Sequence, residues 1–67
     1  MSARHESTTQ PGLFFWAEPT GGREGAVASF GVVSQANGYP MTEAWDDWFA
    51  READADEIAQ QLAKGEL

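Results

Sequence analysis

The segment from Met41 to Gly65 carries the clearest secondary-structure signal in the chain and constrains the fold most. Trp45, Trp48 and Phe49 have the i, i+3, i+4 spacing of one face of a helix. Thr42 precedes them as a helix-capping residue. The glycine that closes the segment, preceded by a lysine, is typical of a helix end. The pattern therefore predicts a C-terminal helical region that presents aromatic side chains to a core.

The apolar stripe of this region does not continue at regular spacing. The next position of the same face is Glu52, and further along the chain Asp54 and Glu57 form a pair like a capping box. We therefore expect two consecutive short helices, over residues 42–52 and 55–64, with a break near residues 53–54. A single kinked helix is the alternative.

Two apolar segments upstream predict strands. Residues 13–18 and 26–34 are rich in aromatic and β-branched residues and are separated by a glycine-rich turn over residues 19–25. Gly31 lies within the second strand, which indicates a bulge or the close approach of a ring. The expected fold class is α+β: a small β-hairpin of two or three antiparallel strands, the third near Tyr39, packed against the C-terminal helix or helices.

The rest of the chain predicts one small domain. Residues 1–12 are polar and end in Pro-Gly, which favours a disordered N-terminal arm, and residues 13–67 would form a single α+β domain. The 67 residues include no Cys, so disulfides cannot stabilise so small a core. Large aromatic rings must supply it. The residues expected to meet in the core are Phe15, Phe30, Val32, Trp45, Trp48 and Phe49.

The composition argues against most chemistry. Four basic residues stand against eleven acidic ones, a formal charge of −7, which disfavours binding to nucleic acid or to anionic membranes. A chain with one His and no Cys lacks the usual metal ligands, and its acidic residues do not follow the calcium-loop pattern. No Ser or Thr has an Asp or His partner at a spacing that indicates a catalytic pair. We expect no enzyme activity, no metal and no cofactor.

What remains as a candidate site is the surface. Acidic side chains on the C-terminal region could attract a larger protein with a basic surface, and carboxylates spaced along a helix could imitate a phosphate backbone. Trp16, on a strand with aromatic residues on both faces, could add an exposed anchor. Acidity that serves only solubility is the alternative. The predicted partner-binding residues are Asp46, Asp47, Asp54, Asp56, Glu57 and Trp16.

In size, acidity, lack of Cys and lack of a catalytic set, the chain is similar in style to small phage-encoded inhibitors, such as anti-CRISPR, anti-restriction or polymerase-binding proteins. The resemblance implies an inhibitor or regulator of a nucleic-acid-processing enzyme. A structural or assembly subunit, either a homodimer or a phage particle component that uses an apolar sheet face, is the alternative. The sequence has no long apolar run and no secretory signal at its N-terminus, so a cytoplasmic location is expected.

Overall fold

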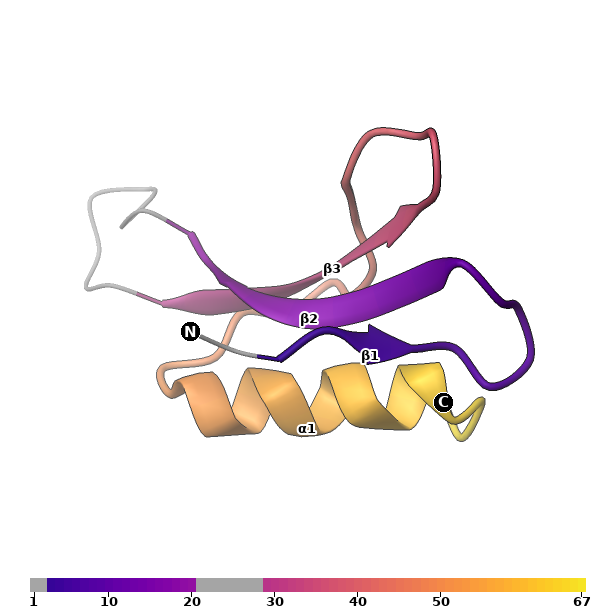
Figure 1. The fold of residues 1–67 in the computed structure, drawn as a ribbon. Coiled ribbons are helices and arrows are strands. Elements are labelled where there is room, and N and C mark those ends of the chain that lie inside the picture. Colours follow the sequence, from indigo (N-terminus) through magenta and orange to yellow (C-terminus); the bar gives the residue numbers. More distant parts are fainter. Residues whose placement is uncertain (1–2, 21–28) are drawn as a thin grey trace.

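A computed structural model describes residues 3–20 and 29–67. In this part of the chain, four antiparallel strands form one sheet in the order β1-β2-β3-β4, and a single helix lies along one face of it (Figure 1). The predicted α+β class is confirmed, with one helix in place of two. The elements are β1 (His5–Glu6), β2 (Leu13–Pro19), β3 (Phe30–Ala36), β4 (Thr42–Glu43) and α1 (Glu52–Ala63).

The long central pair β2 and β3 forms the body of the sheet, with Leu13 opposite Ala36 at one end and Pro19 opposite Phe30 at the other. Side chains alternate along each strand as the sequence predicts. Phe15 and Ala17 point toward α1, on the face of the sheet that we call the helix face. Trp16, which lies between them, points to the opposite face, which we call the far face. Residues 21–28, which include most of the predicted glycine-rich turn, lie outside the described residues.

The helix packs on the sheet through alanine. Ala55, Ala59 and Ala63, spaced by four residues, are buried, and the first two meet Ala17 and Val32 in the core. Side chains with a single methyl group let the helix backbone approach the sheet closely. Larger apolar residues then fill the margins of this contact, half-buried: Phe15, Phe30, Trp45, Phe49, Ile58 and Leu62.

The predicted helix over residues 42–52 is wrong, and so is the predicted break near residues 53–54. Thr42 and Glu43 form β4, and the Ala44 N–H donates to the Val32 carbonyl at 2.9 Å. Further along, Phe49 and Phe30 exchange two backbone hydrogen bonds of 2.7 and 2.8 Å. Trp, Phe, Thr and Asp are weak helix formers, and the edge of β3 offers backbone groups that need partners. Pairing with β3 therefore prevails over helical periodicity.

Between these two pairings the chain departs from the ladder. If the register that places Val33 opposite Glu43 continued, Asp46 would lie opposite Phe30. Phe49 occupies that place instead. The extra residues lift the chain, and the Trp48 ring covers Gly31. A Cβ there would lie 3.4 Å from Trp48 Cδ1.

The close approach of a ring to Gly31 is thus confirmed. Trp48 itself is 36% exposed, so its assignment to the core is wrong, whereas Trp45 and Phe49 pack on the core as predicted.

The predicted N-terminal arm takes part in the fold, so its assignment as disordered is wrong for the described residues. β1 pairs with the outer edge of β2. Ser7 is buried, and its hydroxyl oxygen accepts two backbone N–H groups of the following turn at 3.2 and 3.1 Å. The Thr8 N–H donates to the Ala63 carbonyl at 2.8 Å, which ties this segment to the end of the helix. The edge of β2 and the last helical carbonyls recruit the arm because both need hydrogen-bond partners.

The ends of α1 follow local rules at one terminus only. Gly65 has φ of 76°, and its N–H donates to the Leu62 carbonyl. The N–H of Glu66 donates to the Gln61 carbonyl. This is a Schellman motif, so the predicted helix end is confirmed. At the other terminus the helix begins before the predicted capping pair, and its N-cap residue, Arg51, forms no side-chain cap.

One polar contact joins β1 to α1. His5 Nε2 donates to Asp56 Oδ1 at 2.7 Å, and Gln60 donates to the other carboxylate oxygen at the same distance. Partial burial raises the pKa of Asp56, but these two hydrogen bonds and the charge of His5 outweigh it and hold that pKa below its ordinary value of 3.8.

Enlarging a buried alanine tests the helix packing. Ala59→Leu adds three carbons to a fully buried contact and is expected to lower the free energy of unfolding by about 1–3 kcal/mol. Ala53→Leu, at an exposed position of the same helix, is the matched control and should change stability little. Urea denaturation measures both. Equal effects at the two positions would show that α1 does not pack through its alanines.

The Asp56 contact predicts a pH dependence. Because the folded-state pKa of Asp56 is lowered, its contribution to stability is present above the ordinary value of 3.8 and is lost as the pH falls through the folded-state pKa. Asp56→Asn should therefore lower the melting temperature at neutral pH, and the difference from the native protein should shrink in acid. Asp47→Asn, which removes the same charge at an exposed site, should show no such convergence.

Candidate functional site

The structure does not gather the five predicted acidic residues into one surface. Asp46 and Asp47 are exposed in the loop that precedes α1. Asp54 and Asp56 point to opposite flanks of the helix, since each residue turns by about 100°. Glu57 is exposed on the side away from the sheet.

The two flanking carboxylates already have contacts within the chain. Asp54 Oδ2 lies 3.3 Å from Arg51 Nε, in an exposed pair, whereas Asp56 is held by His5 and Gln60. Asp56 in particular is a structural residue of the β1–α1 contact, with only 26% of its side chain exposed. Asp46, Asp47 and Glu57 are the predicted acidic residues that the fold leaves exposed.

Trp16 is not the exposed aromatic anchor that the sequence predicts. It is 6% exposed, on the far face of the sheet beside Val33. The guanidinium of Arg4 lies 4.3 Å from the centroid of its ring, and its indole N–H donates to Glu18 Oε2 at 2.6 Å. Trp16 therefore packs as part of the fold, and its expected exposure is wrong, whereas its contact with a partner stays a prediction.

Other apolar side chains are exposed instead. Tyr39 is 70%, Met41 47% and Trp48 36% exposed, and all three belong to one stretch, which we call the 39–48 segment. The segment also carries three acidic residues and contains no Lys or Arg. Sequence reasoning missed Tyr39 and Met41 as surface residues. Their position on either side of a proline was the available signal, because apolar side chains in a turn often have no layer to pack on.

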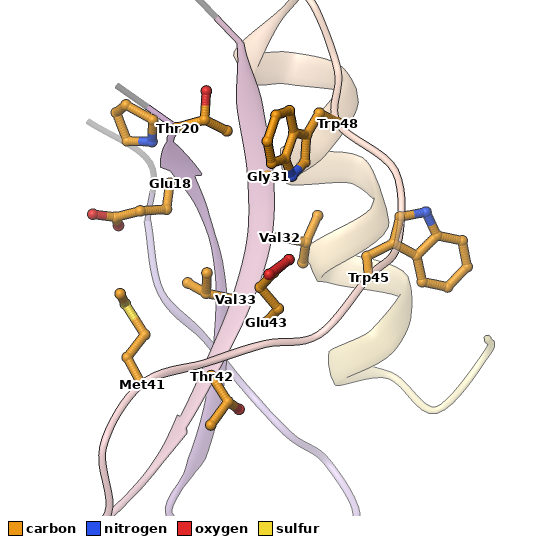
Figure 2. Close-up of a pocket in the computed structure, with 11 residues that line it drawn as sticks. Glu18, Thr20, Gly31, Val32, Val33, Met41, Thr42, Glu43, Trp45 and Trp48 are labelled. Carbon is orange, nitrogen blue, oxygen red and sulfur yellow. The ribbon is translucent and has the colours of Figure 1, made fainter. Parts of the chain in front are cut away.

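A hollow of about 330 Å³ lies beside this segment, on the far face of the sheet. Figure 2 shows Glu18, Met41, Glu43 and Trp48 arranged around Val33 and Gly31. In the described part of the chain, no Lys or Arg lines this far-face hollow. The full lining is Glu18, Pro19, Thr20, Gly31, Val32, Val33, Met41, Thr42, Glu43, Trp45 and Trp48.

A second, more open hollow of about 360 Å³ lies between β1 and the C-terminal half of α1. Arg4, His5 and Lys64 line it together with Glu6 and uncharged residues. Its charges are mixed, and His5 is engaged with Asp56. Among residues 3–20 and 29–67, no three His, Asp or Glu side chains are grouped to hold a metal ion, and no helix is long and apolar enough to cross a bilayer.

The far-face hollow and the 39–48 segment form the candidate binding surface. They combine exposed aromatic and thioether side chains with carboxylates. Comparison with known proteins found no match among protein-family models, curated proteins or solved structures.

Proposed function

We propose that this protein is a small acidic interaction module that inhibits or regulates a larger protein with a basic surface. The observation that carries the proposal is the 39–48 segment. Its exposed apolar side chains, Tyr39, Met41 and Trp48, lie on either side of three acidic residues in a stretch without any positive charge. Aromatic and methionine side chains are enriched where proteins contact one another, and a charged rim selects the partner and speeds encounter.

The segment is held in place before a partner arrives. Its first half pairs with β3 through β4, and the Ala44 N–H donates to the Val32 carbonyl. Just beyond its end, Phe49 pairs with Phe30. A surface fixed by backbone hydrogen bonds loses little conformational freedom on binding, so more of the contact energy becomes affinity.

The acidity of the chain favours a partner that normally holds nucleic acid. A net charge of −7 on 67 residues repels phosphate and attracts the lysines and arginines that bind it. The finer form of the proposal is therefore inhibition by occupation of a nucleic-acid site, in the manner of phage-encoded anti-CRISPR or anti-restriction proteins. Competition between this protein and nucleic acid for the isolated partner tests that form directly.

An assembly subunit that uses an apolar sheet face is the alternative function. Two central residues of the far face, Trp16 and Val33, are buried in the single chain, which leaves less apolar surface there than such an interface uses. Met41 and Trp48 are the exposed apolar residues that a second copy could cover. Sedimentation at high concentration distinguishes the cases, because an assembly subunit should associate with itself.

Charge reversal on the loop tests the proposed function. Asp46→Lys combined with Asp47→Lys should weaken binding to the partner by about tenfold, because two exposed attractions become repulsions. The binding of the native chain should also weaken steeply with salt, since charges on the surface are screened over about 10 Å at 0.1 M. The measurement is capture from the lysate of the encoding or host organism, followed by affinity at several salt concentrations.

Glu57→Lys combined with Glu66→Lys is the matched control. It changes the net charge equally, at exposed positions away from the 39–48 segment. If both double variants weaken binding to the same degree, overall acidity and not this surface drives recognition. An affinity that does not change with salt concentration, and that is unaffected by the Asp46 and Asp47 reversals, would contradict the proposal.

A further inference from the structure

The far-face hollow has the size of a site for one long side chain. Its volume of about 330 Å³ is at the lower limit of roughly 300–1,000 Å³ for small-molecule sites. Its floor is apolar, made by Val33 and by Gly31, which has no side chain (Figure 2). Met41 stands at one side with nearly half of its surface exposed. An aliphatic chain that lies on this floor would be removed from water without burying the polar groups of side chains in the floor.

The strand register puts a carboxylate on each side of that floor. Glu18 on β2 lies opposite Gly31, and Glu43 on β4 lies opposite Val33, so both acids flank β3 on the same face. Residues paired across antiparallel strands project to the same side of a sheet. With two carboxylates and no Lys or Arg among the described lining residues, the hollow is complementary to a positive charge.

The same face already holds a guanidinium against an indole. Arg4 lies 4.3 Å from the Trp16 ring centroid, and that indole donates to Glu18. The far-face hollow offers similar components nearby, since Trp48 forms part of its wall and Glu18 part of its rim. Arginine suits such a site better than lysine because its planar guanidinium stacks on aromatic rings and pairs with carboxylates through two hydrogen bonds.

We propose that the far-face hollow receives an arginine side chain of the partner protein. The aliphatic stem lies on Val33 and Met41, and the guanidinium pairs with the carboxylates of Glu18 and Glu43. This inference rests on the proposed function and specifies it: the partner presents a protruding arginine, and the 39–48 segment forms the surrounding contact. Asp46 and Asp47 then guide the encounter, whereas Glu18 and Glu43 hold the inserted group.

The test uses N-acetyl-arginine amide as the probe and its uncharged analogue N-acetyl-citrulline amide as the control ligand. The full chain is titrated with each while the three indole N–H signals are followed by NMR, assigned through single Trp→Phe variants. The arginine probe should shift the Trp48 signal in a saturable way. The citrulline analogue, which has the same shape without the charge, should shift it far less.

Two conservative variants locate the charge partners. Glu18→Gln and Glu43→Gln should each weaken binding of the arginine probe by roughly two- to fivefold, the range for an exposed ion pair. Glutamine at position 18 keeps an acceptor for the Trp16 indole, and thermal melting confirms that each variant is folded. Glu57→Gln, distant from the hollow, should leave the affinity unchanged. Equal effects of the two ligands, or equal effects of all three variants, would overturn the inference.

The partner itself separates this inference from the proposed function. If Glu18→Gln with Glu43→Gln leaves partner binding intact while reversal of Asp46 and Asp47 weakens it, the hollow is not the arginine site although the acidic surface still binds. If neither pair of changes affects partner binding, the proposed function fails as well. Weaker partner binding with each of the two pairs of changes supports an arginine seated in the hollow and guided by the loop.

Discussion

The close contact between α1 and the β2–β3 pair is the interaction on which the rest of the structure depends. Ala55 and Ala59 on the helix meet Ala17 and Val32 on the sheet, and all four are buried. Such small residues bury little area each, so the contact is stable only when larger side chains close its margins. Aromatic rings supply that closure. A domain of this size has few other means of stabilisation, since it contains no Cys.

The two-stranded centre creates a second requirement, because both of its edges expose backbone hydrogen-bonding groups. β1 satisfies one edge and β4 with Phe49 the other. Both come from segments whose side chains do not read as strands. The arm is also anchored at Thr8 to the last turn of α1, and at His5 to Asp56. The short outer strands thus pair with both edges of the sheet, and the arm that contains β1 also joins the sheet to the helix.

This closure decides which side chains reach the solvent. The far face buries Trp16 beneath Arg4, while the lifted chain before Phe49 exposes Trp48. The two indoles therefore have the reverse of their expected roles. The acidic residues are divided in the same way: Asp56 serves the fold, and Asp46 remains at the surface. The candidate binding surface consequently lies beside β4, where exposed apolar groups and carboxylates lie together.

Local chemistry in the sequence determined the α+β class, the two-face alternation of residues 13–18 and the helix end at Gly65, and it indicated a bulge or a close ring at Gly31. Each depends on neighbours in the chain or on one residue's steric freedom. Only the tertiary structure decided that residues 42–49 follow β3 and that the N-terminal arm belongs to the sheet. Residues 42–49 have helical spacing and the N-terminal arm is polar. In both cases the unpaired strand edges of the sheet, elsewhere in the chain, decide the structure that forms. The hollow beside β4 also depends on this register, so the sequence alone could not place it.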